Sequence, residues 1–204
     1  MRDAKQFWDR SAARYAKSSI RDQAGYEKKL AITREYFRPD WSVLEFGCGT
    51  GSTAILHAPF VGHIVATDIS DRMLEIARQK AEAASIDNVI FRQGTLDSLE
   101  FEPESFDAVL GLNILHLLEE VEGAISTVYG LLKPGGVFIS STALVGELNI
   151  LWRAVIPLMQ AVGLAPFVNR FRRGELVAML EQSGFSIDRE WQPGKGSLFI
   201  VARK

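Results

Sequence analysis

The stretch that decides the fold of this chain is Val43-Leu44-Glu45-Phe46-Gly47-Cys48-Gly49-Thr50-Gly51. The apolar residues before the first glycine predict a buried strand over 42–46, and the apolar spacing after the last glycine predicts a helix over 52–57. The three glycines between them lack a Cβ, so the loop can adopt positive φ and let a ligand approach the backbone closely. The free N–H groups that open the helix suit an anionic group. Because a plain tight connection has the same pattern, other residues must decide whether this loop binds a ligand.

An acidic residue ends the next predicted strand, over 63–67. Asp68 follows the glycines by about 20 residues, where a carboxylate can accept hydrogen bonds from both hydroxyls of a ribose. A later apolar run predicts a strand over 107–112 that ends at Asn113. Since ligands of open α/β sheets bind at the carboxyl ends of the strands, these residues indicate a nucleoside-binding crevice.

The spacing of the glycines argues against a dinucleotide. A dinucleotide loop has the pattern G-x-G-x-x-G, whose third glycine would fall at Ser52. Glu45 instead stands two residues before Gly47. A carboxylate there would repel a pyrophosphate but would suit a cationic amine or a sulfonium, so we expect Glu45 to be ionised.

The pattern E-x-G-x-G-x-G resembles motif I of the class I S-adenosylmethionine-dependent methyltransferases. The resemblance covers roughly residues 40–142 in motif order, through Asp68 and then through 88–95, 105–109 and 131–136. It implies an α/β fold with a doubly wound, mostly parallel, seven-stranded sheet, helices on both faces and an antiparallel last strand, which is the Rossmann-like methyltransferase fold. The remaining strands are expected over 88–92, 137–141, 185–191 and 197–203, and further helices over 71–84, 119–132 and 175–183.

The same resemblance implies S-adenosylmethionine as the cofactor. Glu45 would organise the loop and face the amine of the cofactor, and Asp68 would bind the ribose. Backbone approach is expected at Gly47, Gly49 and Gly51, and further contacts at Tyr15, Cys48, Ile69, Met73, Thr95, Leu96 and Asn113. For four of these we weigh a structural alternative: amphipathic packing for Tyr15, core packing for Ile69 and Met73, and small-residue filler for Cys48.

The expected contact to the adenine amine departs from the family pattern. Family members often carry an aspartate directly after the glycine of the third strand, whereas Gly94 is followed by Thr95 and Leu96, with Asp97 displaced. Either the Thr95 hydroxyl and the Leu96 N–H take this role, or Asp97 reaches back.

Two segments flank the core of the chain, which we treat as one domain over residues 1–204. Residues 1–38 predict a helical lid in two pieces, broken near Ser18-Ser19 or near Gly25. Residues from about 143 to 172 are strongly apolar but are interrupted by polar residues and prolines, so they do not predict a membrane-spanning helix. We expect this apolar segment to cover an apolar acceptor site. An interfacial patch in peripheral contact with a membrane, or extra core, are the alternatives.

Among the three histidines, His116 lies closest to the binding edge. Its ordinary pKa near neutrality suits a general base, and a histidine satisfied by the backbone is the alternative. His57 and His63 are not spaced as metal ligands with any acidic residue, so we expect no metal.

Composition narrows the class of protein. The chain of 204 residues has a net charge of -2 and 47% hydrophobic residues, which favours an ordinary globular domain without a nucleic-acid partner. The single cysteine excludes an intramolecular disulfide. No apolar signal region opens the chain, so a cytoplasmic location is expected. The sequence assigns no oligomeric state.

We therefore predict an enzyme that transfers a methyl group from S-adenosylmethionine to a small molecule, with an apolar or lipid-like acceptor as the narrower expectation. One alternative is a non-catalytic module that binds S-adenosylmethionine. An NAD-dependent reductase is a weaker alternative, disfavoured by Ser52.

Overall fold

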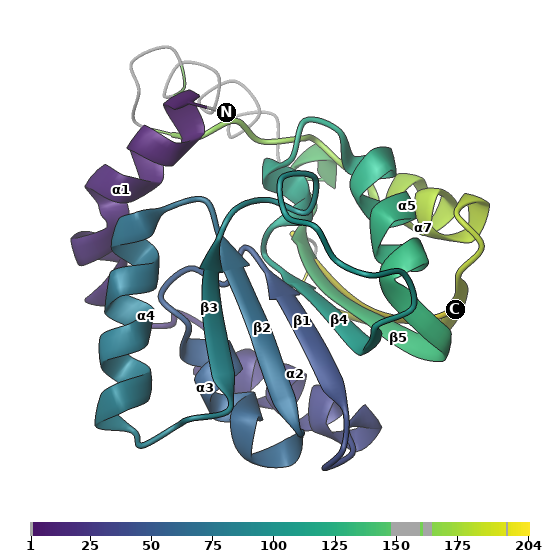
Figure 1. Cartoon of the computed structure of the whole chain (residues 1–204). Helices are drawn as coiled ribbons and strands as arrows, with labels where there is room; N and C mark the ends of the chain where they lie inside the picture. Colours follow the sequence, from purple (N-terminus) through teal and green to yellow (C-terminus); the bar gives the residue numbers. More distant parts are fainter. Residues whose placement is uncertain (1, 148–159, 161–164, 195) are drawn as a thin grey trace.

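Seven strands form one sheet in the order β3-β2-β1-β4-β5-β7-β6 (Figure 1). The structure is a computed structural model that describes residues 2–147, 160, 165–194 and 196–204. The strands are β1 Ser42–Phe46, β2 His63–Asp68, β3 Val89–Gln93, β4 Phe106–Leu112, β5 Leu132–Ala143, β6 Ser186–Gly194 and β7 Ser197–Arg203. The first five strands pair in parallel, and β7 runs antiparallel between β5 and β6. This arrangement confirms the predicted fold class.

Helices cover both faces of the sheet (Figure 1). They are α1 Arg2–Ala16, α2 Gln23–Tyr36, α3 Ser52–His57, α4 Asp71–Ala83, α5 Val121–Leu131 and α7 Arg173–Gln182, with short 3-10 turns at Ala58–Phe60, Leu115–Leu117 and Val145–Glu147. The predicted break in the N-terminal helix lies at residues 17–22, near Ser18-Ser19. Gly25 lies inside α2, whose N-cap Asp22 accepts a hydrogen bond from the Gly25 N–H.

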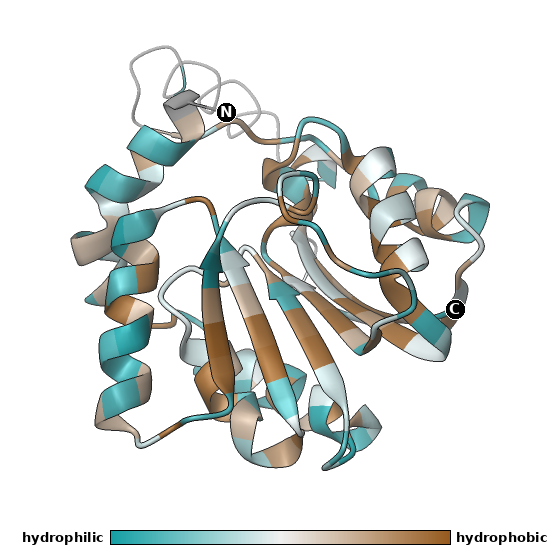
Figure 2. Cartoon of the chain, in the orientation of Figure 1, coloured by the Kyte–Doolittle hydropathy of each residue, from teal (hydrophilic) through white to brown (hydrophobic). Residues whose placement is uncertain are grey.

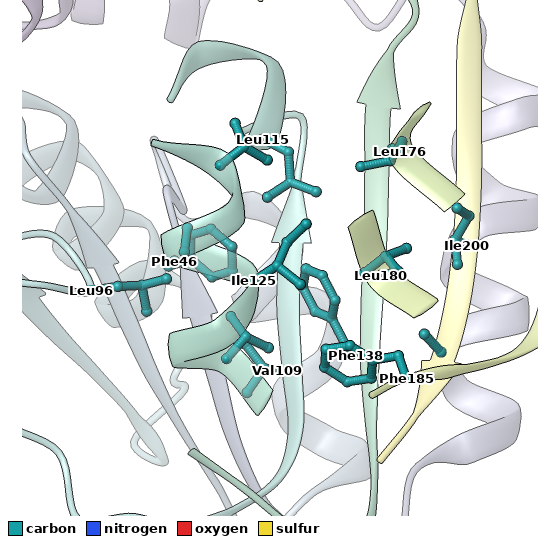
Figure 3. Close-up of a cluster of buried hydrophobic side chains, with 14 of the residues drawn as sticks. Phe46, Leu96, Val109, Leu115, Ile125, Phe138, Leu176, Leu180, Phe185 and Ile200 are labelled. Atoms are coloured by element: carbon teal, nitrogen blue, oxygen red, sulfur yellow. The ribbon is translucent and has the colours of Figure 1, made fainter. Parts of the chain in front are cut away.

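The two faces of β1 contribute to two different clusters of buried side chains. Leu44 and Phe46 pack on one face in a cluster that includes Ile125 of α5 and Leu180 of α7 (Figure 3). Val43 packs on the opposite face with residues of α2, α3 and α4. Figure 2 shows the apolar residues concentrated along the strands, as expected for strands whose side chains are buried on both faces of the sheet. The sheet is therefore buried on both sides, and the edge formed by the carboxyl ends of the parallel strands is left to bind ligands.

Helix α1 is attached to the start of α4. The Asp9 carboxylate accepts a hydrogen bond from the Ser70 hydroxyl at 2.7 Å, and Lys5 pairs with Asp9 at 2.8 Å and with Asp71 at 3.1 Å. Ser70 is also the N-cap of α4, where its Oγ accepts a hydrogen bond from the Met73 N–H. One buried hydroxyl thus joins the N-terminal helix to the strand–helix unit that carries Asp68.

Much of the apolar segment over residues 143–172 lies outside the described residues. The described parts place Val145 and Phe171 in the buried interior. No helix of the described residues is long and apolar enough to cross a membrane.

Gly51 allows the β1–α3 loop to pack directly on α4 and β3. It has φ of 71°, and a Cβ at this position would lie 2.7 Å from the Ala77 Cβ and 2.9 Å from the Phe91 ring. Gly51→Ala should therefore lower the free energy of unfolding by about 1–3 kcal/mol, measured by urea denaturation. Gly123→Ala is the matched control, because the Gly123 site in α5 is exposed and has no atom within 4 Å of the added Cβ. That change should raise stability by about 0.5–1 kcal/mol. Equal shifts in the two variants would contradict the packing argument.

Candidate functional site

A cavity of about 290 Å³ lies at the carboxyl ends of β1, β2 and β4. Nine of the twelve residues expected to contact the cofactor line it: Tyr15, Gly47, Gly49, Asp68, Ile69, Met73, Thr95, Leu96 and Asn113. Residues far apart in the sequence therefore meet at the edge that the strand order predicts. Glu45, Cys48 and Gly51 do not line this cavity.

The glycine loop forms the floor of the cavity. All three glycines have positive φ, between 55° and 71°. At Gly47 a Cβ would lie 2.6 Å from the Ile114 side chain, so no larger residue fits there. At Gly49 the nearest atom to an added Cβ is a Tyr15 ring carbon at 3.8 Å, and this glycine faces the cavity. The loop thus exposes its backbone to a ligand under the ring of Tyr15.

Backbone N–H groups hold the Asp68 carboxylate in place. Oδ2 accepts a hydrogen bond from Gly49 N at 2.9 Å, and Oδ1 accepts one from Ser70 N at 2.9 Å. Burial raises the pKa of Asp68, and these two hydrogen bonds partly offset that effect. Each oxygen retains a second lone pair. This geometry suits a pair of hydroxyl groups such as those of a ribose.

Glu45 lies beneath the loop, and the expectation that it is ionised is wrong for the cofactor-free protein. The side chain is 3% exposed, and its Oε2 makes no hydrogen bond to another described residue. Burial, with a smaller contribution from the charge of Asp68, raises the pKa of Glu45 to about 8. The carboxyl group therefore holds its proton near neutral pH, because no cationic side chain among the described residues stabilises the anion.

These residues fit the cofactor that the sequence resemblance implies. The unpartnered Glu45 Oε2 is a buried acceptor below the glycine loop, and a cationic amine or sulfonium is the chemistry that it would satisfy. Asp68 presents fixed oxygens to the cavity, and the glycine loop faces the cavity with the backbone of Gly47 and Gly49. Glu45 and Asp68 would hold the charged and hydroxylated parts of S-adenosylmethionine, respectively.

The structure places Cys48 and Gly51 as packing residues. Cys48 is 8% exposed and belongs to the cluster on the α2–α4 face, and burial raises the pKa of its thiol. Gly51 packs against α4 and β3, as described above. Met73 both lines the cavity and is 2% exposed, so its cofactor and core interpretations coexist.

Both residues proposed for the adenine contact line the cavity. The Thr95 N–H donates to the Ser98 Oγ at 2.7 Å, and the Thr95 Oγ1 accepts from the Ser98 N–H at 3.2 Å. Thr95 is therefore engaged in a local turn, which favours Leu96 and Asp97 for the adenine edge. Asp97 lines the same cavity.

His116 lies apart from the cavity, and its contacts agree with the backbone-satisfied alternative. Its Nδ1 accepts a hydrogen bond from Ala143 N at 3.3 Å, and its carbonyl accepts one from Asn169 N at 2.7 Å. Burial lowers the pKa of the imidazole to about 4. The nitrogen that would take up a proton is already occupied, so this geometry does not favour a general base.

A second cavity of about 200 Å³ lies between α2, α3 and the ends of β4 and β5. It shares Leu112 and Asn113 with the first cavity. Its polar lining includes Lys29 and His57, which were not predicted as ligand contacts. No sequence motif contains both residues, because they lie far apart in the chain. Within the described part of the chain, no three His, Cys, Asp or Glu side chains gather as metal ligands.

The raised pKa of Glu45 predicts a pH-dependent stability. The folded protein holds a proton between the ordinary pKa of 4.5 and the raised value of about 8, and the unfolded chain releases it. The free energy of unfolding should therefore fall as pH rises through this range. Relative to Glu45→Gln, which does not titrate, the melting temperature of the wild type should drop by several degrees between about pH 5 and pH 8. Glu122→Gln, at an exposed position, is the control. Parallel curves for the wild type and Glu45→Gln would show that Glu45 is ionised throughout.

Comparisons with known proteins agree with this geometry. Residues 43–136 match a family model described as a methyltransferase domain. The uncharacterized methyltransferase YcgJ of Bacillus subtilis is 33% identical over 115 residues, which cover 56% of this chain and 46% of that protein. The demethylmenaquinone methyltransferase of Symbiobacterium thermophilum is 30% identical over 142 residues, which cover 66% of this chain and 57% of that protein.

The fold is also similar to that of solved structures. The crystal structure of an S-adenosylmethionine dependent methyltransferase from Mesorhizobium loti superposes with a TM-score of 0.73 and 21% identity, covering 90% of this chain and 99% of that one. The chain spans about half the length of the curated relatives it matches. The matched domain, the strand order and the glycine loop lead to one conclusion: residues 43–136 form a methyltransferase domain, in a sheet with the Rossmann-like methyltransferase fold.

Proposed function

We propose that this protein transfers a methyl group from S-adenosylmethionine to a small-molecule acceptor. The observation that carries the proposal is the first cavity, where the fixed Asp68 carboxylate and the open glycine loop lie above the unpartnered Glu45. A ribose and a cationic centre are the groups that this arrangement suits. The nine predicted cofactor contacts that line the cavity support the same assignment.

The cofactor supplies the chemistry, because its sulfonium makes the methyl group electrophilic. The chain's own residues then need to bind the donor and hold an acceptor in line with it. Asp68 would accept hydrogen bonds from the ribose. Ile69 would pack on the face of the adenine, and Leu96 and Asp97 would meet its edge. Asn113, at the end of β4, would contact the methionine part. No general base is assigned, because His116 is hydrogen-bonded to the backbone outside the cavity.

An apolar acceptor is the narrower form of the proposal. The first cavity has an apolar wall beyond the glycine loop, formed in part by Leu117, Leu118 and Phe167. Phe167 belongs to the segment expected to cover the acceptor, and it is 46% exposed. The name of the Symbiobacterium relative gives demethylmenaquinone as its substrate, which is an apolar molecule. Together these observations support an acceptor with a largely apolar body.

The N-terminal lid also contributes to the proposed site. Ala4, Trp8 and Tyr15 of α1 line the first cavity, and the Asp9–Ser70 hydrogen bond fixes this helix beside Asp68. We therefore assign α1 the role of covering the cofactor. Pro166 and Phe167, from the segment 143–172 that we propose as a second lid, line the same cavity.

Substitution of Asp68 tests the cofactor site. Asp68→Ala removes the oxygens proposed to bind the ribose, so the affinity for S-adenosylmethionine should fall by at least about tenfold in isothermal titration calorimetry. Asp40→Ala, at an exposed turn, is the control and should bind as the wild type does. Thermal melting of both variants without cofactor checks that the fold is retained. Unchanged affinity in a folded Asp68→Ala protein would contradict the assignment.

Substitution of Glu45 tests which part of the cofactor faces the buried carboxyl group. Glu45→Gln should weaken S-adenosylmethionine and S-adenosylhomocysteine alike, because both carry the amine that the carboxylate would hold. It should leave 5′-methylthioadenosine nearly unchanged, since that molecule lacks the amino-acid part. The three dissociation constants are measured at one pH. Equal weakening of all three ligands would show that Glu45 acts only on the shape of the loop.

Turnover separates an enzyme from a non-catalytic binding module. Protein incubated with S-adenosylmethionine carrying a radiolabelled methyl group and with a small-molecule extract should transfer label to an extractable product. The Asp68→Ala protein is the matched negative control. Tight binding of the cofactor without any transfer would favour the binding module.

A further inference from the structure

The second cavity adjoins the first at the end of β4. Leu112 and Asn113 line both cavities, so a ligand in either one would contact these two residues. The rest of its lining comes from the turn before α2, from α2 and α3, and from β5. A ligand there would be separate from the ribose site at Asp68, which lies two strands away at the end of β2.

A lysine lies at this junction without a carboxylate partner. Lys29 Nζ donates to the Ser141 Oγ at 2.8 Å, and the Ser141 hydroxyl lies 3.4 Å from the Asn113 Oδ1 as its donor. None of the ion pairs within the described ranges includes Lys29. Burial lowers the pKa of this amine, and the charge of Asp22 partly opposes that effect. A partly buried cation of this kind gains most from an anionic ligand.

The other charged group in the lining is already engaged. The Asp22 carboxylate accepts the Gly25 N–H at 2.9 Å as the N-cap of α2. An added Cβ at Gly25 would lie 2.1 Å from the Asp22 Oδ2, so the carboxylate is packed against the start of the helix. Asp22 keeps its negative charge, which acts on Lys29, but its hydrogen bond holds it at the start of α2. Lys29 is the positive charge of the lining, and its bond to Ser141 places it at the Asn113 end of the cavity.

A buried histidine also lines this cavity. His57 is 0% exposed, and neither of its ring nitrogens hydrogen-bonds to another described residue. Burial, with a smaller contribution from Arg34, lowers the pKa of the ring to about 3, so the ring is neutral. Two unpartnered polar atoms at a buried position are costly, and a polar group on a ligand would satisfy one of them.

The remaining lining is mixed. Ile20, Leu30 and Leu112 are apolar, and the polar members are Tyr26, Thr33, Thr53, Asn113 and Ser141. The volume of about 200 Å³ limits the occupant to a small molecule. The cavity thus combines one cation, one neutral ring with hydrogen-bonding nitrogens, several hydroxyl groups and some apolar surface.

We propose that the second cavity is a subsite for the acidic end of the acceptor, beside the first cavity, and that the acceptor is a small molecule with one acidic oxygen, a carboxylate or a phenolate. Lys29 pairs with the acidic oxygen, and His57 hydrogen-bonds a second polar group of the same molecule. This inference rests on the proposed methyl transfer and names the class of its acceptor. Lys29 and His57 are specificity-determining residues in this scheme.

The carboxylate of the cofactor's own methionine is the other source of an anion near Lys29. Two ligands that differ in this group separate the sources. S-adenosylhomocysteine carries the carboxylate, and 5′-methylthioadenosine lacks it. If Lys29 serves the acceptor, Lys29→Met should bind both ligands within about twofold of the wild type. If Lys29→Met weakens S-adenosylhomocysteine by about tenfold or more and leaves 5′-methylthioadenosine unchanged, Lys29 serves the cofactor and the proposal is overturned.

Small probes test the acceptor subsite directly. With the protein saturated by S-adenosylhomocysteine, calorimetry measures binding of 4-hydroxybenzoate, benzoate and the uncharged benzamide. We expect both acids to bind the wild type at least about tenfold more tightly than benzamide. Lys29→Met should lose this preference. Lys28→Met is the matched control, because Lys28 is exposed on the same helix with its Nζ 4.3 Å from the centre of the Trp191 ring, and it should retain the preference.

A spectroscopic measurement reports on His57 without a substitution in the core. In protein labelled with ¹⁵N-histidine, 4-hydroxybenzoate should shift a ring-nitrogen resonance of His57 and leave that of the exposed His63 in place. An unshifted His57 overturns its part in the proposal. Failure of both acids to bind a wild type that does bind S-adenosylhomocysteine overturns the acceptor subsite and leaves the proposed function standing. Failure of S-adenosylhomocysteine to bind would overturn the proposed function itself.

Discussion

The hydrogen bonds from Gly49 and Ser70 to the Asp68 carboxylate are the interaction on which the binding edge depends. They join the loop after β1 to the end of β2, and Ser70 at the same time caps α4 and bonds to Asp9 of α1. The three glycines of the loop have no side chains to fix their backbone, so the bond from Gly49 to the neighbouring strand supplies a restraint there. The carboxylate therefore organises the floor of the cavity before any ligand arrives, at the cost of a raised pKa. Such preorganisation lowers the entropy lost on binding.

Local pattern and the family resemblance together predicted the sheet and most of the expected contact residues that line the first cavity. An apolar strand, a glycine loop and the apolar spacing of the following helix are all set by residues close in sequence, which is why β1, α3 and the position of Asp68 could be predicted. Ser18-Ser19 marked the helix break correctly because the following Asp22 caps α2. The alternative break at Gly25 was wrong, because the Gly25 N–H donates to the N-cap Asp22 and so lies in the first turn of α2.

Properties that depend on distant parts of the chain were beyond the sequence. The protonation of Glu45 follows from complete burial without a cation, and no motif reports burial. His116 looked suited to catalysis by its position after β4, yet the end of β5 supplies an N–H that occupies its Nδ1. Lys29 and Ser141 are 112 residues apart, so only the folded chain brings the amine to the strand end. The second cavity is therefore a product of tertiary structure alone.

The backbone conformation of Asn113, which lines both cavities, limits which residue types can occupy this position. It is a non-glycine residue with φ of 59°, a conformation that Gly, Asn and Asp adopt far more readily than other residues. Its backbone N–H is bonded to the Ser141 carbonyl at 2.7 Å, which fixes this geometry. Of the residues that keep the turn, glycine deletes the amide and aspartate adds a negative charge beside Lys29. In homologues, we therefore expect only glycine, asparagine or aspartate at this position. Differences in the proposed acceptor would then come from substitutions in α2 and α3, which form most of the rest of the second cavity.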